Sequence, residues 1–252
     1  MGLRVEMSAQ GKKKESRFEL LRTILFAGLI AIGFRSFLFE PFNIPSGSMM
    51  PTLLVGDYLF VSKFSYGYSR HSFPLGLVPF DGRVMSDTPE RGDVVVFRQP
   101  TETSVAFIKR VVGMPDDEIQ VKAGILHING IPVERRLVGE GTATNGISVM
   151  KYMVYEETLP GGRTHLIQEM SDQASLDNTI AFKVPPGHYF MMGDNRDNSN
   201  DSRVSNVGMV PAENLIGEAQ RLFYSHNSTA RIWEIWKWPF AIRYGRIGDS
   251  II

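Results

Sequence analysis

The run Val105-Ala-Phe-Ile-Lys-Arg-Val-Val112 sets the fold class that we expect for this 252-residue chain. It is short and rich in β-branched and aromatic residues, which is typical of a β-strand. Similar runs occur at residues 58–64, 93–97 and 189–192, and glycine, proline, asparagine or aspartate separates them. Few segments after residue 40 repeat apolar residues with the 3.6-residue period of a helix. We therefore expect a mainly β body built from antiparallel sheet.

A hairpin and two loops are the clearest local predictions within this body. Residues 125–128 precede Asn129-Gly130, a pair that suits a two-residue turn, and residues 131–133 form the returning strand. Two polar stretches, Gly139–Gly146 and Ser171–Asn178, have the composition of surface loops.

The N-terminal end has a different character. The twelve residues from Thr23 to Phe34 carry no charge, and Leu20 to Phe39 forms a span of twenty residues if one arginine near each end is allowed. As a helix this span is about 30 Å long, close to the hydrocarbon thickness of a bilayer. A cleavable signal peptide would need a small-residue cleavage site, and a buried soluble helix would need a polar face. The sequence offers neither, so we expect a single transmembrane anchor at residues 20–39.

Charge is distributed unevenly, although the chain has 27 basic and 27 acidic residues in total. Residues 1–22 hold six basic residues against three acidic ones, whereas the remainder holds 21 against 24. A basic flank stays in the cytoplasm, so we expect a cytoplasmic tail at residues 1–19 and a body on the other side of the membrane. Zero net charge argues against a nucleic-acid binder that relies on bulk charge.

The chain has no cysteine, which excludes disulfide frameworks, thiol nucleophiles and thiolate metal sites. Any covalent catalysis therefore uses an oxygen or nitrogen nucleophile. The five histidines lie outside the motifs described next, and we expect them to have structural roles; they are at positions 71, 127, 165, 188 and 226.

Three segments carry a chemical signal. Residues 45–52 read Pro-Ser-Gly-Ser-Met-Met-Pro-Thr, and two prolines and a glycine restrict the loop around its serines. Lys109 lies between apolar neighbours on a predicted strand, where burial would lower its pKa and make the amine a candidate base. Residues 193–203 read Gly-Asp-Asn-Arg-Asp-Asn-Ser-Asn-Asp-Ser-Arg, which predicts a rigid loop bonded to its own backbone.

Each of these segments has a structural alternative. The first could be an ordinary turn, the lysine could point into water from an edge strand, and the third could be a polar surface turn. The third segment also looks like a calcium loop, but the spacing fails because Arg196 falls at a ligand position. We expect no metal site. A fourth segment, residues 91–97, is a turn entering a buried strand.

Together these segments resemble the bacterial type I signal peptidases, membrane-bound serine proteases that remove signal peptides from exported proteins. They occur in that family's order, after an N-terminal anchor, and the resemblance covers roughly residues 20–118 and 186–225. It implies a β-sheet catalytic domain made of residues 40–118 and 186–252. A smaller β domain would be inserted at residues 119–186.

The resemblance also implies a role for each matching residue. Ser48 matches the nucleophile, and Lys109 matches its general base. The hydroxyl of Ser46 and the backbone N–H of Ser48 match the oxyanion hole, and Ser199 matches the residue that orients the lysine amine. The supporting positions around the base are Asp201, Arg203 and Arg110. The apolar candidates for pockets that accept small residues at the −3 and −1 positions of a substrate are Phe42, Ile44, Met50 and Ile108.

No cofactor is implied by this resemblance. The expected partners are preproteins bearing signal peptides, the lipid bilayer and a nearby secretion translocon. The expected location is the bacterial cytoplasmic (inner) membrane, with the catalytic domain on the periplasmic face. Two alternatives stay open: a relative dedicated to a single pilin or conjugation substrate, and a membrane-anchored adaptor without catalysis.

The C-terminal stretch 232–246 carries a separate hypothesis. It contains all three tryptophans of the chain, interleaved with Lys237, Arg243 and Arg246. Indole rings and long cationic side chains favour a membrane interface. Packing of this stretch on the catalytic domain is an equal alternative.

Overall fold

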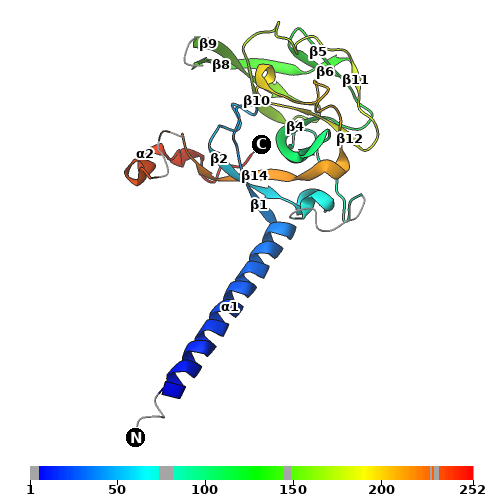
Figure 1. Ribbon diagram of the computed structural model, residues 1–252. Coiled ribbons are helices and arrows are strands. Elements are labelled where there is room, and N and C mark those ends of the chain that lie inside the picture. Colours follow the sequence, from blue (N-terminus) through cyan, green and yellow to red (C-terminus); the bar gives the residue numbers. More distant parts are fainter. Residues whose placement is uncertain (1–5, 74–81, 145–148, 228, 230–232, 252) are drawn as a thin grey trace.

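A long N-terminal helix projects from a body of β-sheets (Figure 1). The computed structural model describes residues 6–73, 82–144, 149–227, 229 and 233–251. The helix α1 spans Glu6–Phe37, and its apolar part, Phe18–Phe37, is long enough to cross a membrane and is almost entirely exposed. The helix ends two residues before the predicted limit of residue 39, because Phe39 already pairs with Ser62 in the first strand.

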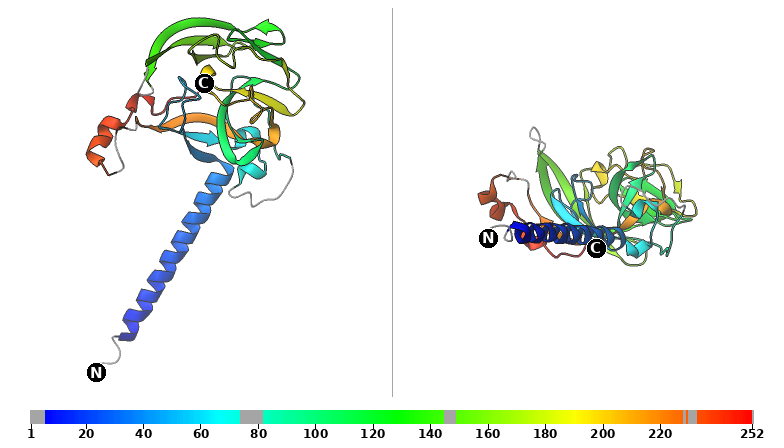
Figure 2. Two further views of the ribbon diagram at one scale, coloured as in Figure 1. Left: turned by 45° about the horizontal axis from the view of Figure 1, so that its top comes forward. Right: turned by 60° about the horizontal axis from the view of Figure 1, so that its bottom comes forward.

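Hydrogen bonds and ion pairs fix the joint between the helix and the body. Glu40 binds Arg35 of α1 at 2.7 Å and the buried Lys63 at 2.8 Å. The Tyr68 hydroxyl donates to the backbone carbonyl of Phe37, the last residue of the helix, at 2.7 Å. The anchor therefore leaves the body in a defined direction, which Figures 1 and 2 show beside β1.

The largest sheet has seven strands in the order β1-β2-β14-β3-β4-β12-β13, and neighbouring strands are antiparallel. Its strands are β1 (Phe39–Asn43), β2 (Asp57–Ser62), β3 (Val94–Gln99), β4 (Glu102–Gly113), β12 (His188–Met192), β13 (Val210–Pro211) and β14 (Leu215–Ser225). The four predicted runs fall largely within β2, β3, β4 and β12. The mainly β, antiparallel fold class is therefore confirmed.

Two smaller antiparallel sheets lie between β4 and β12 in the chain. One contains β5 (Glu118–Lys122), β6 (Ile125–Ile128), β7 (Ile131–Pro132) and β11 (Phe182–Lys183). The other contains β8 (Glu134–Thr144), β9 (Val149–Thr158) and β10 (Thr164–Glu169). The predicted hairpin is confirmed, because Ile128 pairs with Ile131 across the turn and both Asn129 and Gly130 have positive φ.

One loop prediction is wrong and the other is confirmed. The described part of Gly139–Gly146, residues 139–144, forms the end of β8 and pairs with β9, while residues 145 and 146 lie outside the described residues. The Tyr152 ring replaces the missing side chain at Gly141, where a Cβ would lie 2.4 Å from a ring carbon. Ser171–Asn178 contains only turns and bends.

Residues 114–187 form an excursion from the main sheet between β4 and β12, and this excursion shares an apolar core with the main sheet. β12 lies next to β4, so the chain returns beside the strand from which it left. One apolar cluster joins both parts; it includes Val112, Phe190 and Met192 of the main sheet and Ile119, Leu126, Leu159 and Val184 of the excursion. The division into a catalytic domain and an insert at 119–186 stays a prediction, and Figure 2 shows the two parts as one compact body.

Candidate active site

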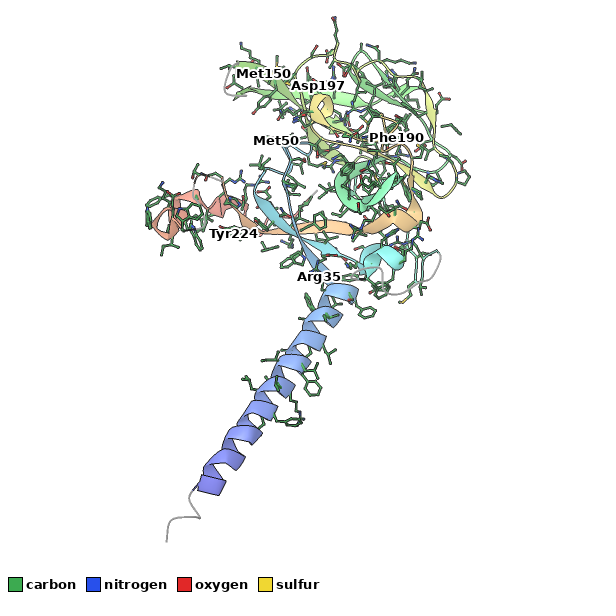
Figure 3. The ribbon with its side chains drawn as sticks, in the orientation of Figure 1. Arg35, Met50, Met150, Phe190, Asp197 and Tyr224 are labelled. Carbon is green, nitrogen blue, oxygen red and sulfur yellow. The ribbon has the colours of Figure 1, made fainter. Side chains whose placement is uncertain are left out.

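The loop that carries Ser48 connects β1 to β2. Hydrogen bonds close its base, where the Ile44 N–H donates to the Asp57 carbonyl at 2.8 Å and the Gly56 N–H donates to the Ile44 carbonyl at 3.0 Å. Met49 and Leu53 are fully buried in the core beneath it. Core packing therefore holds the backbone on either side of Ser48. Met50, labelled in Figure 3, lies on the same loop.

Lys109 lies on β4, opposite Val95 of β3, and is 4% exposed. Its Nζ is 2.7 Å from Ser48 Oγ, and it also donates to the Ile108 carbonyl at 2.9 Å. The Phe107 ring lies 5.5 Å from Nζ. Burial lowers the pKa of Lys109 to about 8, and the negative charges of Asp201 and Asp194 only partly oppose this effect. A fraction of the amine is therefore neutral near pH 7, as a general base requires.

Two donors lie near the position that an oxyanion would take. Ser46 Oγ is 3.5 Å from Ser48 Oγ, and Ser46 is exposed. Within the described part of the chain, the Ser48 backbone N–H makes no hydrogen bond, so it is available to a substrate carbonyl. These are the two groups that the resemblance assigns to the oxyanion hole.

The segment 193–203 is held by buried ion pairs. Asp201 accepts two hydrogen bonds from the Arg203 guanidinium, each of 2.9 Å, one from the Arg203 N–H at 3.2 Å and one from the Gly193 N–H at 3.0 Å. Arg110 binds Asp194 in the same two-pronged way, at 2.8 and 2.7 Å. Arg110 thus holds the Asp194 carboxylate, and the supporting role that the resemblance gives it stays a prediction.

Hydrogen bonds join the loop that carries Ser48, which the resemblance makes the nucleophile loop, to the 193–203 segment. The Asn195 N–H donates to the Ser48 carbonyl at 3.1 Å, and Asn195 Nδ2 donates to the Gly47 carbonyl at 3.0 Å. Thr52 Oγ1 donates to Asp194 at 2.5 Å. The backbone of Ser48 is thus fixed from two sides, by the core below and by this segment.

The residues that form this site lie within a match to a known protein family. Residues 17–224 match the family described as signal peptidase, peptidase S26. The chain belongs to this signal peptidase family. The matched residues include the apolar helix, Ser48, Lys109 and the 193–203 segment.

Individual relatives agree over most of their length. Signal peptidase I of Rickettsia typhi is 45% identical over 212 residues, which cover 81% of this chain and 79% of that protein. Signal peptidase I of Rickettsia prowazekii is 45% identical over 214 residues, with the same coverage of 81% and 79%. The crystal structure of a signal peptidase I from Enterococcus faecalis aligns with a TM-score of 0.31 at 22% identity, covering 52% of this chain and 97% of that chain.

The orienting role that the resemblance gives Ser199 stays a prediction. Ser199 is buried, and in the described residues its Oγ makes no hydrogen bond to the Lys109 amine, although it lies close enough to Asp201 to help lower the pKa of that carboxyl. It lies against Gly193, where a Cβ would be 2.2 Å from Ser199 Oγ and 2.5 Å from the Ser48 carbonyl oxygen. The Lys109 amine also donates to the Ile108 carbonyl, a contact that the sequence does not indicate because every residue carries a carbonyl.

His165 and Glu157 are buried neighbours of the site that sequence reasoning missed. His165 Nε2 lies 3.4 Å from Glu157 and 4.0 Å from Asp194. Burial, followed by the charge of Arg110, lowers the pKa of His165 to about 4, so the ring is neutral near pH 7. The structural role expected for this histidine stays a prediction, and its ring packs directly against a motif residue, Asp194. Pairing of β9 with β10 brings it there.

The four pocket candidates differ in accessibility. Ile44 and Ile108 are buried in the core cluster beneath the nucleophile loop, and Phe42 packs against the same cluster while partly exposed. Met50 is also partly exposed and folds over Gly47, where a Cβ would lie 3.0 Å from the Met50 sulfur. A substrate side chain can therefore reach Phe42 and Met50 more directly than the two isoleucines.

The burial of Lys109 predicts a pH-dependent stability. Its pKa of about 8 lies below the ordinary 10.5, so between these pH values the unfolded chain binds the additional proton. The free energy of unfolding should therefore rise from about pH 8 to pH 10.5, by up to about 3 kcal/mol. Urea unfolding of the full chain in detergent micelles, followed by circular dichroism, measures this change. The Lys109→Met protein should lack this rise. An equal dependence of the free energy of unfolding on pH in the two proteins would contradict a lowered lysine pKa.

Proposed function

We propose that this chain is a membrane-bound serine endopeptidase that removes N-terminal signal peptides from exported preproteins through a Ser48–Lys109 dyad. The observation that carries the proposal is the 2.7 Å distance between the buried Lys109 amine and Ser48 Oγ in a member of the signal peptidase family. The Rickettsia relatives are named signal peptidase I, which supports the same activity.

The reaction begins when neutral Lys109 accepts the Ser48 proton as Oγ attacks the scissile carbonyl. The Ser46 hydroxyl and the Ser48 N–H donate hydrogen bonds to the oxyanion that forms. The Lys109 ammonium then protonates the leaving amine of the mature protein, and an acyl ester remains on Ser48. Lys109 next takes a proton from a water molecule, whose oxygen attacks the ester. The Lys109 ammonium then returns this proton to Ser48 Oγ as the signal peptide is released. The Ile108 carbonyl holds the amine throughout.

The substrate would bind as an extended chain, with alternate side chains entering shallow pockets. Small residues at −3 and −1 fit pockets whose floor is the core around Ile44 and Ile108. Partly exposed Phe42 and Met50 would form the walls. The mature part of the preprotein and the secretion translocon would lie on the same side of the membrane as the body.

The membrane arrangement follows from the apolar helix and its charged flank. The six basic residues against three acidic ones within residues 1–22 favour an N-terminus in the cytoplasm and a body on the periplasmic face of the inner membrane. The described part of the C-terminal stretch supports a second lipid contact. Trp233 and Trp236 are each 65% exposed and Phe240 is 85% exposed. The helix α2 (Trp238–Ala241) projects from the body in Figure 1.

The two arginines of this stretch, Arg243 and Arg246, instead pack on the body, as the alternative hypothesis states. Arg243 donates to Ser225 Oγ at 2.8 Å, and Arg246 binds the buried Asp57 at 2.6 Å. These arginines tie the end of the chain to the nucleophile loop, because Arg246 also donates to the Thr52 carbonyl at 2.9 Å. The aromatic residues and the arginines thus have different roles in the proposal.

Substitution of the dyad tests the proposed function. Ser48→Ala should lower kcat on a preprotein by about 10⁶-fold, and Lys109→Ala should lower it by about 10²–10⁴-fold. Lys122→Ala, at an exposed lysine on β5, is the matched control and should leave the rate unchanged. Product N-termini are sequenced for several unrelated preproteins. Wild-type processing by Lys109→Ala would contradict the dyad, and cleavage of only one pilin-like substrate would favour the dedicated relative.

Tryptophan fluorescence tests the lipid contact, because all three tryptophans lie in the C-terminal stretch. The full chain is reconstituted into vesicles whose acyl chains carry bromine, which quenches indole fluorescence at close range. We expect strong quenching by the brominated lipid and little quenching by aqueous acrylamide. The reverse pattern would contradict the contact and favour a segment that stays in water.

A further inference from the structure

A buried ion pair joins the β9–β10 hairpin to the segment that holds the nucleophile. Glu157 on β9 is 1% exposed, Arg196 is 2% exposed, and two hydrogen bonds connect them, one of 2.8 Å. Burial alone would raise the pKa of Glu157, but the charge and hydrogen bonds of Arg196 outweigh burial and lower it. Both groups therefore stay charged, and neither belongs to the proposed reaction.

A short path of one peptide bond and two hydrogen bonds leads from this pair to the Ser48 loop. Arg196 is the immediate neighbour of Asn195, whose N–H and side-chain amide bind the carbonyls of Ser48 and Gly47. Arg196 begins the single 3₁₀ turn Arg196–Asn198, and its own carbonyl accepts a hydrogen bond from Arg203 at 2.7 Å. A carboxylate from another part of the chain can therefore hold this turn in place by binding the Arg196 guanidinium.

The hairpin contacts the same turn through its backbone. The Gln168 N–H donates to the Asp194 carbonyl at 2.8 Å, and Gln168 forms a parallel bridge with Asn195. The N–H groups of Met170 and Ser171 donate to Asp197 at 2.6 and 3.0 Å. Asp197 is labelled in Figure 3, on the turn beside the hairpin. The hairpin therefore packs on the turn, and Glu157 holds the turn through its ion pair with Arg196.

We propose that Glu157 is a positioning residue for Ser48. Through Arg196 it fixes the Asn195 turn, which holds the two carbonyls flanking the Ser48 N–H and so sets the distance between Ser48 Oγ and Lys109 Nζ. The inference rests on the proposed Ser48–Lys109 chemistry. A displacement of about 1 Å between reacting groups lowers a rate by about 100-fold, so a change at Glu157 reaches the reaction without any contact with substrate.

A purely structural role is the competing explanation. Removing one member of a buried ion pair strongly destabilises a protein, because the other charge is left without a partner. Loss of folded protein must therefore be separated from loss of rate in the folded protein. A rate per active site, with active enzyme counted by covalent titration of Ser48, makes this separation.

The matched control is Arg163, in the turn that joins β9 to β10. Arg163 forms an ion pair with Asp93 at the start of β3, so it ties the hairpin to the main sheet without reaching the Asn195 turn. Arg163→Gln should destabilise the hairpin's attachment and keep kcat per active site close to the wild-type value.

The experiment measures kcat, KM and the pH profile per active site for the full chain in micelles. We expect Glu157→Gln and Arg196→Gln each to lower kcat by about 10- to 100-fold with little change in KM. The acid limb of the profile should not move, because the burial of Lys109 is unchanged. The double variant should lose no more than either single variant, since the two residues act as one unit.

Three results would overturn the inference: unchanged kcat in Glu157→Gln, an equal loss in Arg163→Gln, or losses that multiply in the double variant. If Glu157→Gln does not fold, Glu157→Asp replaces it, since it keeps the charge and shortens the reach to Arg196. An intermediate loss of kcat then supports the inference, and wild-type kcat overturns it. Cleavage by Ser48→Ala would instead defeat the proposed function on which this inference rests, and that result is distinguishable from the three results above.

Discussion

Lowering the pKa of a lysine amine beside a serine hydroxyl is the constraint on which the rest of this structure depends. Burial of Lys109 among strand residues disfavours its ammonium form, but two carboxylates, Asp194 and Asp201, lie close enough to favour it. Each carboxylate is bound by its own arginine, Arg110 or Arg203. The arginines offset charges that would otherwise raise the lysine pKa and remove the base. The buried ion pairs are therefore part of the chemistry of the site.

Three distant parts of the chain converge to meet this constraint. The main sheet supplies Lys109 and the apolar core under the nucleophile loop. The 193–203 segment holds the backbone of Ser48, and the β9–β10 hairpin holds that segment in turn. The apolar helix joins the main sheet at Glu40, whose ion pairs with Arg35 and Lys63 hold the helix against the body. The membrane anchor and the sheet that carries Lys109 are thus parts of one connected structure.

The features that the sequence predicts correctly are those with a local cause. Strand composition and the Asn129-Gly130 turn act over a few residues, and the structure contains both. The proximity of Lys109 to Ser48 came from a resemblance in motif order, since no local rule brings together residues 61 positions apart. The Gly139–Gly146 prediction failed because tertiary packing of Tyr152 compensates for glycine. The pairs Glu157–Arg196 and His165–Asp194 depend on how the strands pair. The residues around each partner do not indicate that pairing.

The protonation state of Lys109 is the most direct test of this account. Lysine labelled with ¹³C at Cε is incorporated into full-length Ser48→Ala protein in micelles, and the Cε shift is followed from pH 6 to pH 11. Comparison with Ser48→Ala/Lys109→Met protein assigns the Lys109 signal. The account predicts a midpoint at about pH 8, well below the ordinary 10.5. A midpoint at or above 10.5 would mean that almost none of the amine is neutral at pH 7, and the serine would then lack its base.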